Sequence, residues 1–224
     1  IDSLRYWVDS VVDGFRPYLQ RLRAGPQGGE SLEAFHLDVL KQLERHRVLC
    51  AHRRGVFGVT GANEAVQRAL AAAGVLEPVG AWWLGRPVLV TANDYSVGRY
   101  NGDVGLVVCD ADGDWVVAFP DEQGVSYLPL ARMPEHQTVF AMTIHKSQGS
   151  EFDDVLVVLP AEPSPVLTRE LVYTGITRAR QRVSVLGAER VLRYALERQV
   201  RRASGLGRAF GAAERHPELV ERRQ

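Results

Sequence analysis

Apolar residues recur at helical spacing in two segments near the start of the chain. The first stripe runs through residues 4–23 and the second through residues 32–43, with a glycine-rich turn between them. Pro17 predicts a break or restart of the first helix near Phe15, because proline lacks a backbone donor. These patterns predict a helical lead-in over residues 1–46.

The next apolar run, Arg47–Ala51 (RVLCA), is typical of a short buried strand. Asn63 follows as a predicted N-cap, because its side chain can accept a hydrogen bond from the first turn of a helix. That helix is expected over Glu64–Ala73 and is expected to end at Gly74.

The pattern changes near Trp82, and from Arg86 to about Leu130 it consists of short runs rich in Val, Leu, Tyr and Phe. Gly, Asn and Asp separate these runs, which read RPVLVT, DVGLVVC, DWVVAFP and GVSYLPL. Strands at such short, regular spacing predict a small β-barrel over residues 84–134.

After Pro134 the pattern returns to alternating strands and helices. Strands are expected at residues 139–144, 155–159 and 183–186, and helices at residues 169–180 and 189–202. The simplest topology is an α/β domain over residues 47–83 and 135–224 into which the barrel is inserted.

Composition narrows the function classes. The chain has 224 residues, of which 46% are apolar and 24% charged, and this excludes a disordered or fibrous protein. Basic and acidic residues both number 27, so net charge does not indicate a nucleic-acid partner. Two cysteines, no secretory signal and no apolar run of about 20 residues indicate a cytoplasmic protein without a membrane partner.

Lysine is scarce: only Lys41 and Lys146 occur among the 27 basic residues. The chain contains no G-x-x-x-x-G-K-[ST] phosphate loop, so it does not carry its own P-loop. It begins at Ile1 inside an amphipathic pattern, which predicts that it is a piece of a longer protein.

One polar segment concentrates the chemistry. Residues 143–153 (TIHKSQGSEFD) follow an apolar strand and carry hydroxyls, an imidazole, an ammonium, an amide and carboxylates. A polar loop after a buried strand is where α/β sheets place ligands. Gly149 would let the backbone turn sharply or approach a ligand closely.

Two arginine-bearing segments could face an anion. Thr168 is expected to cap the helix over 169–180, with a core stripe that includes Ile176 and Val183. Arg178 lies off that stripe, and the missing side chain of Gly175 would clear room beside it for phosphate. In the third segment, Arg53 and Arg54 follow the RVLCA strand.

These segments carry a resemblance. TIHKSQGSEFD followed by RELVYTGITRAR resembles the fifth and sixth motifs of superfamily 1 helicases, and AHRRGVFGVTGAN resembles the fourth. The stretch from Asn93 to Gly105 is similar to the N-D-Y…N-G-D-x-G stretch of the 5′→3′ branch, and residues 201–206 are similar to the end of the RecD family, the alpha subunits of exodeoxyribonuclease V (RecBCD). The match covers about residues 47–206.

The resemblance implies a RecA-like second motor domain with an inserted Src-homology-3-like barrel. In that family ATP lies between two motor domains, and the first domain supplies the P-loop and the Mg²⁺ ligands, so no metal site is expected here. The implied activity is an ATP-dependent 5′→3′ DNA helicase in double-strand-break repair and recombination. The implied partners are DNA and RecB-like and RecC-like subunits.

Residue by residue, the resemblance implies a nucleotide side of the site. Arg178 matches the sixth-motif arginine that reaches the γ-phosphate as an arginine finger. Arg54 matches the fourth-motif arginine, and Arg53 beside it is the alternative contact. Glu151 matches the glutamate that accepts a hydrogen bond from the ribose.

The same resemblance implies a DNA side. Thr143 and His145 match the residues that contact single-stranded DNA, and Lys146 and Ser147 complete that loop. Gln148 and Gly149 would contact the nucleotide and couple it to the DNA.

Other interpretations stay open. The chain could come from a single-chain RecD-like or relaxase-associated helicase, or from a non-catalytic scaffold that keeps the fold. Asn101-Gly102 is by itself a hairpin-turn signal. The Trp82-Trp83 pair is expected to pack at the barrel junction, and the arginine-rich end of the chain is expected to be a solvated helix face.

Overall fold

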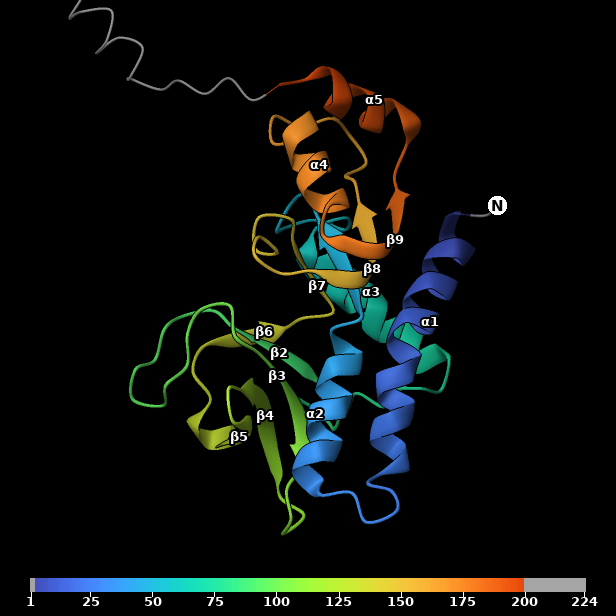
Figure 1. The fold of residues 1–224 in the computed structure, drawn as a ribbon. Helices are drawn as coiled ribbons and strands as arrows, with labels where there is room; N and C mark the ends of the chain where they lie inside the picture. Colours follow the sequence, from blue (N-terminus) through green and yellow to red (C-terminus); the bar gives the residue numbers. More distant parts are fainter. Residues whose placement is uncertain (1–2, 200–224) are drawn as a thin grey trace, which may run out of the picture.

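The computed structural model describes residues 3–199, which form two β-sheets with helices around them (Figure 1). The helices are α1 Ser3–Ala24, α2 Leu32–Leu43, α3 Val59–Ala72, the 3-10 turn η1 Leu130–Arg132, α4 Arg169–Ile176 and α5 Glu189–Glu197. The strands are β1 His46–Cys50, β2 Pro87–Val90, β3 Val104–Cys109, β4 Trp115–Asp121, β5 Gly124–Pro129, β6 His136–Thr138, β7 Ala141–Thr143, β8 Phe152–Val158 and β9 Ala179–Leu186. The α/β class is confirmed.

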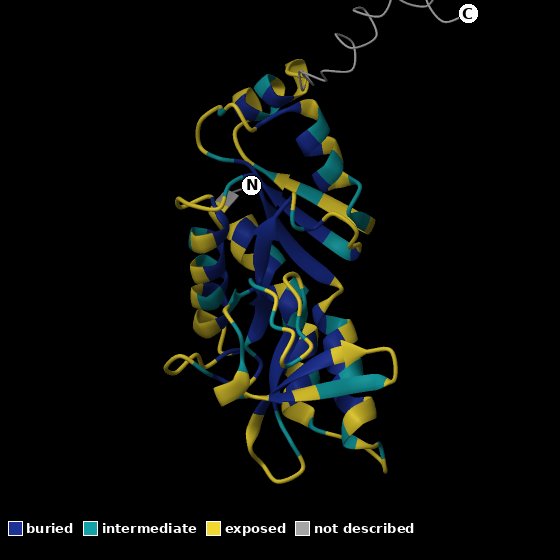
Figure 2. Ribbon diagram, turned by 90° about the vertical axis from the view of Figure 1, so that its left-hand side faces the viewer, coloured by how far each residue is buried: buried dark blue, intermediate teal, exposed yellow. Residues whose placement is uncertain are grey.

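A parallel four-stranded sheet, ordered β7-β1-β8-β9, is the centre of the α/β part. Alternate residues of β1 enter different cores, Val48 with the cluster under α1–α3 and Leu49 with the cluster under α4 and α5. Helices therefore cover both faces, which explains why all five residues of β1 are buried. Figure 2 shows these buried strands in dark blue inside the molecule.

The four predicted strands of the insertion are confirmed as β2–β5. They form an antiparallel sheet ordered β5-β4-β3-β2-β6, whose two end strands are not paired with each other. Closure into a small Src-homology-3-like barrel over residues 84–134 stays a prediction.

The strand predicted over residues 139–144 is the shorter β7, and the sequence interpretation missed β6 directly before it. β6 ends at Thr138 in the antiparallel sheet and β7 begins at Ala141 in the parallel sheet. Val139 and Phe140 between the two strands are fully buried, which explains why the apolar run in the sequence begins before β7. The chain therefore passes from the antiparallel sheet into the parallel sheet within two residues.

Two predicted helix boundaries near the start are wrong. α1 continues through Pro17, because the fully buried Phe15 and Tyr18 anchor the helix on both sides of the lost hydrogen bond. α3 begins at Val59 rather than at Glu64, so Asn63 lies inside the helix and is not its cap. α5 ends at Glu197, because the backbone of Arg198 is extended, so the helix predicted to residue 202 is too long; residues 200–202 lie outside the described residues.

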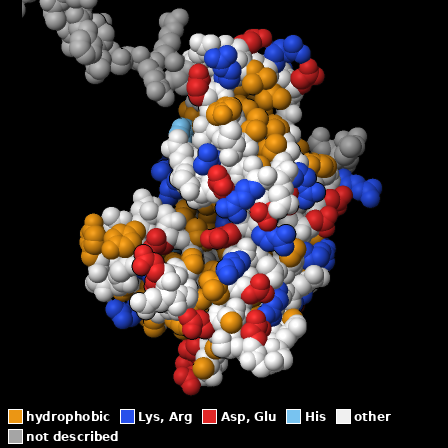
Figure 3. Space-filling view, viewed as in Figure 1, with side chains coloured by type: hydrophobic (Ala, Val, Ile, Leu, Met, Phe, Trp, Pro, Cys, Tyr) orange, Lys and Arg blue, Asp and Glu red, His pale blue; other side chains and the backbone are white. Residues whose placement is uncertain are grey.

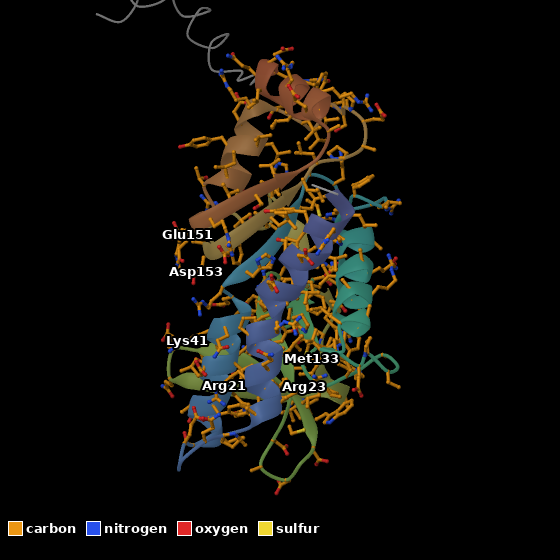
Figure 4. All side chains as sticks on the ribbon, turned by 90° about the vertical axis from the view of Figure 1, so that its right-hand side faces the viewer. Arg21, Arg23, Lys41, Met133, Glu151 and Asp153 are labelled. Carbon is orange, nitrogen blue, oxygen red and sulfur yellow. The ribbon has the colours of Figure 1, made fainter. Side chains whose placement is uncertain are left out.

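Helices α1 and α2 are joined by an ion-pair network at their shared end. Arg21 donates from Nε to Asp38 Oδ2 at 2.8 Å and from Nη2 to both oxygens of Glu30. Its guanidinium also lies 4.5 Å above the centre of the Phe35 ring. Figure 4 shows Arg21 between the two helices. This network holds the helical lead-in as one unit.

His46 is buried directly beneath α1. A Cβ atom at Gly14 would lie 2.3 Å from His46 Cγ, so the helix crosses the ring where it has no side chain. Within residues 3–199 neither ring nitrogen of His46 has a hydrogen-bond partner. Burial lowers the pKa of His46 to about 4, with Asp154 opposing the shift and Arg47 and Arg182 adding to it.

We expect His46 to make the fold acid-sensitive. In the unfolded chain its pKa is about 6.5, so between pH 6.5 and 4 the unfolded state takes up a proton that the folded state does not. The stabilisation present at pH 7 is therefore lost as the pH falls, by about 2 kcal/mol between pH 7 and pH 5. Urea unfolding at both pH values measures this loss.

The variant His46→Phe should remove that pH dependence, while replacement of the exposed His145 should leave it in place. An unchanged pH dependence in His46→Phe would contradict the assignment.

Candidate functional site

Residues 144–151, here called the motif loop, connect β7 to β8 across the sheet. Ile144 N donates to Cys50 O at 3.0 Å, so the loop starts beside the end of β1. Gly149 has a φ of +90°, a conformation that side-chain-bearing residues rarely adopt. The predicted need for glycine at this turn is confirmed.

Two of the residues predicted to contact DNA shape the motif loop. Ser147 is fully buried, and its hydroxyl donates to Ile144 O at 2.8 Å. Thr143 is 7% exposed, and its Oγ1 accepts from Lys146 N at 3.2 Å. The structure therefore does not support a DNA contact by the Ser147 side chain, because that side chain cannot reach solvent.

Other side chains of the motif loop are accessible. His145 and Gln148 are exposed and line a cleft of about 1070 Å³, which is also lined by Thr168, the N-cap of α4, and by Thr174 within that helix. The sequence interpretation gave His145 to DNA and Gln148 to the nucleotide. The fold brings the two side chains to the same cleft.

Lys146 connects the motif loop to two other parts of the chain. Its Nζ donates to Asn101 Oδ1 of the insertion at 3.3 Å. Partial burial lowers the Lys146 pKa, and the charge of Arg53 lowers it further. Arg53 and Lys146 thus contribute to one local positive region, although the chain has no net charge.

Arg178 lies in the connection between α4 and β9, not in the helix that the sequence predicts over residues 169–180. α4 ends at Ile176, and Arg178 O accepts from Phe152 N at 2.8 Å, which already belongs to the start of the sheet. The predicted Thr168 cap is confirmed, since its Oγ1 accepts from Leu171 N at 3.2 Å.

The Arg178 guanidinium is held by neutral oxygens. Nη1 donates to Ser150 O at 3.1 Å, Nε donates to Thr174 O at 3.3 Å, and Nη2 lies 3.5 Å from Thr177 Oγ1. None of the ion pairs found within residues 3–199 includes Arg178. A cation oriented by neutral groups keeps its charge for an incoming anion, which fits a phosphate.

Gly175 does not clear space for Arg178. A Cβ atom there would lie 3.2 Å from Ile144 Cδ1 and 3.4 Å from Val157 Cγ2, so the glycine lets α4 pack closely on the sheet. The predicted core stripe is also wrong in part, because Ile176 and Val183 are 38% and 37% exposed. Val183 lies in β9, an end strand of the parallel sheet, and Ile176 is the last residue of α4.

Arg53 and Arg54 are exposed on a tight turn between β1 and α3. A Cβ atom at Gly58 would lie 2.3 Å from Arg54 O, so only glycine allows the turn to fold back on the helix start. Thr60 N donates to Arg53 O at 3.2 Å. Of the two arginines, Arg53 is the one whose positive charge lowers the pKa of Lys146.

Glu151 closes the motif loop with an exposed ion pair. Arg180 Nε donates to Glu151 Oε2 at 3.2 Å, and both side chains are more than half exposed. Figure 4 shows Glu151 and Asp153 at the same edge of the molecule. Exposed pairs contribute about 0–1 kcal/mol, so a ribose hydroxyl could take the place of Arg180 at little cost.

Within residues 3–199 no group of three or more His, Cys, Asp or Glu side chains is arranged to hold a metal ion. None of the helices in this described part is long and apolar enough to cross a membrane.

Comparison with known proteins identifies the class of protein that this site resembles. Residues 138–186, which include the motif loop and Arg178, match the UvrD-like helicase C-terminal domain. Among solved structures, the chain is similar to the Pif1 helicase from Candida albicans, with 14% identity over 90% of this chain and 58% of that chain and a TM-score of 0.44.

The particular relatives are RecD proteins. The chain is 49% identical to the RecBCD enzyme subunit RecD of Mycolicibacterium smegmatis over 89% of this chain and 34% of that protein. It is 33% identical to the ATP-dependent RecD2 DNA helicase of Deinococcus radiodurans over 78% of this chain and 24% of that protein. These similarities confirm the resemblance to RecD, and the chain spans about a third of the length of the RecD subunit.

Proposed function

We propose that this chain is the second, RecA-like motor domain of an ATP-dependent 5′→3′ DNA helicase. The observation that carries the proposal is the bond from Arg178 Nη1 to Ser150 O. It joins an arginine oriented for an anion to the backbone of the motif loop, which offers His145 and Lys146 to a second ligand. Movement of either ligand would therefore shift the residues that bind the other ligand.

On the nucleotide side, Arg178 would stabilise the charge that develops on the transferred phosphoryl group. Arg54, with Arg53 as the alternative, would add a second positive charge from the turn after β1. Glu151 would release Arg180 and accept a hydrogen bond from the ribose instead. The bound ATP and Mg²⁺ would supply the phosphoryl-transfer chemistry, with the Mg²⁺ ligands in the first motor domain.

On the DNA side, His145 and Lys146 would contact the single strand, with Lys146 contributing charge to phosphate. Thr143 and Ser147 would act indirectly by holding the motif loop in shape. Gln148 lines the same cleft as His145. When the two motor domains close on ATP, Gln148 would transmit that movement to the bound DNA strand. A DNA motor of this kind needs only a local track of basic residues, and a chain with zero net charge can contain such a track.

We further propose that the complete protein works in a RecBCD-type complex in DNA break repair and recombination, with RecB-like and RecC-like partners in the cytoplasm. The relatives named RecBCD enzyme subunit RecD support this, and the identity of 49% to one of them exceeds the 33% to the RecD2 helicase. The single-chain helicase is the second candidate. A non-catalytic scaffold is disfavoured because Arg178, Arg54 and Glu151 are all present.

The proposed function gives this chain only half of the ATP site, here called the half-site, since the sequence contains no P-loop. We therefore expect the isolated 224 residues to hydrolyse no ATP when single-stranded DNA is added. The complete protein should show DNA-stimulated hydrolysis in the same phosphate-release assay. Turnover by the isolated chain above that of a heat-denatured sample would contradict the half-site.

A further inference from the structure

A projecting segment of the insertion carries a feature that the proposed function does not use. Residues 91–103, here called the aromatic loop, connect β2 to β3 and extend away from the body of the molecule (green, left side of Figure 1). Figure 3, seen from the same side, shows hydrophobic atoms beside acidic side chains at the tip of this projection.

Two tyrosines of the aromatic loop are exposed together. Tyr95 is 77% exposed and Tyr100 is 51% exposed. Their ring centres are 6.0 Å apart at an interplanar angle of 75°. Single exposed apolar side chains are ordinary on protein surfaces, but paired rings on a projection present a contiguous aromatic surface.

The aromatic loop holds these rings without packing them into a core. The backbones of Asp94 and Arg99 exchange two hydrogen bonds, of 2.7 and 3.0 Å. Asn93 Oδ1 accepts from Asn101 N at 2.8 Å, and Asp103 Oδ2 accepts from Tyr100 N at 2.9 Å. Because the polar groups bond one another, the loop is preorganised and a ligand need not order it.

The aromatic loop also lies next to the motif loop. Asn101, the neighbour of Tyr100, accepts the hydrogen bond from Lys146 Nζ at 3.3 Å. A DNA strand that runs along the motif loop past Lys146 would therefore reach the aromatic loop.

The charges beside the rings decide which part of a strand fits. Asp94 and Asp103 carry negative charge close to Tyr95 and Tyr100, and this charge repels phosphates. The flat ring faces instead suit nucleobases, which stack on aromatic side chains with little regard to sequence. The nearby positive charge of Lys146 and Arg53 suits the phosphates.

We propose that Tyr95 and Tyr100 form a base-stacking platform for single-stranded DNA, placed beside the motif loop by the contact between Asn101 and Lys146. This proposal rests on the proposed DNA-binding function and assigns the bases, rather than the backbone, to the insertion.

The test uses the complete protein and two fluorescein-labelled strands of equal length, oligothymidylate and a strand of abasic residues. Binding is followed by anisotropy across a range of salt concentrations. The double variant Tyr95→Ala/Tyr100→Ala should bind oligothymidylate on the order of tenfold more weakly, while its affinity for the abasic strand is unchanged. The salt dependence of binding should also stay unchanged, since no phosphate contact is lost.

The Tyr95→Phe/Tyr100→Phe variant keeps the rings and should bind as the parent does. Tyr173→Ala, which removes a 68% exposed tyrosine from α4, is the matched control and should also bind normally. Equal weakening on both strands, or no weakening on either, would overturn the platform.

Lys146→Ala separates this inference from the proposed function. It should weaken binding of both strands and reduce the slope of log affinity against log salt by about one. If Lys146→Ala and a His145→Ala variant both bind like the parent, the DNA-binding function itself fails. If only the tyrosine variants bind like the parent, the platform alone fails.

Discussion

Replacement of Arg178 by alanine is expected to reduce the DNA-stimulated ATPase of the complete protein by about a thousandfold or more, the effect typical of a lost arginine finger. The guanidinium is oriented by three neutral oxygens, so its removal takes away positive charge that no other group at that point replaces. Single-turnover hydrolysis at saturating ATP and DNA measures the loss. DNA affinity should change little, because within residues 3–199 the hydrogen bond found between Arg178 and the motif loop goes to the Ser150 carbonyl.

Arg180→Ala is the matched control for this expectation. Arg180 is two residues away and also contacts the end of the motif loop, through Glu151, but it is 59% exposed and already paired. Its loss should change hydrolysis less than about tenfold, as expected for an exposed ion pair. If Arg178→Ala loses DNA affinity and ATPase equally, its bond to Ser150 is structural and the arginine is not a finger.

The sequence predicts the elements of this fold better than their ends. β1, β3, β4, β8 and α2 follow from runs of apolar residues at the period of a strand or helix. These patterns survive because burial on one or both faces requires them. The order of strands in the parallel sheet is not local information, so the sequence could suggest the sheet but not its register.

The boundaries that the sequence misplaced depend on distant contacts. Arg178 leaves the helix because its carbonyl accepts from Phe152 N, a residue 26 positions away. Arg47 belongs to the run predicted as a buried strand, but its partner could not be predicted: it is 1% exposed and donates to Val139 O, 92 positions away. Burial lowers the pKa of Arg47 to about 10. Helix propensities and capping rules describe neighbouring residues, so they cannot predict contacts between positions this far apart in the sequence.

The candidate site shows the same division. The residue types of the motif loop identify a ligand-binding segment, and the structure keeps His145, Lys146 and Gln148 accessible or partly accessible. Which hydroxyls serve the ligand and which serve the loop could not be predicted, because Ser147 is buried by the fold of its own turn. The contact of Lys146 with Asn101 joins positions 45 residues apart and has no sequence signal.

Asn63 is where a missed boundary has the largest consequence for stability. Its side chain is 7% exposed and bonds the backbone where the chain enters β7. Oδ1 accepts from Phe140 N at 2.8 Å and Ala141 N at 3.0 Å, while Nδ2 donates to Ala141 O at 3.1 Å and Val59 O at 2.9 Å. One amide thus satisfies the irregular backbone between the two sheets, directly before the motif loop.

We expect Asn63→Ala to lower the free energy of unfolding by about 4 kcal/mol, because it leaves buried N–H and C=O groups unpaired. For a chain of this size that corresponds to a fall in melting temperature of about 10 °C. Thermal and urea unfolding measure the loss. Hydrogen exchange at Phe140 and Ala141 should accelerate in the folded variant, since their donors lose the acceptor.

Gln67→Ala is the control, because Gln67 lies one turn further along α3 and donates a single bond of 3.2 Å to Asn63 O. Its loss should cost less than about 1 kcal/mol. Asn63→Asp keeps the acceptor but places a carboxylate oxygen against the carbonyls of Val59 and Ala141, so it should be as damaging as alanine. If Asn63→Ala is no less stable than Gln67→Ala, the junction is held by the burial of Val139 and Phe140 and not by the amide. A large loss would mean that a polar group fixes the point at which the chain leaves the insertion, and with it the start of the motif loop.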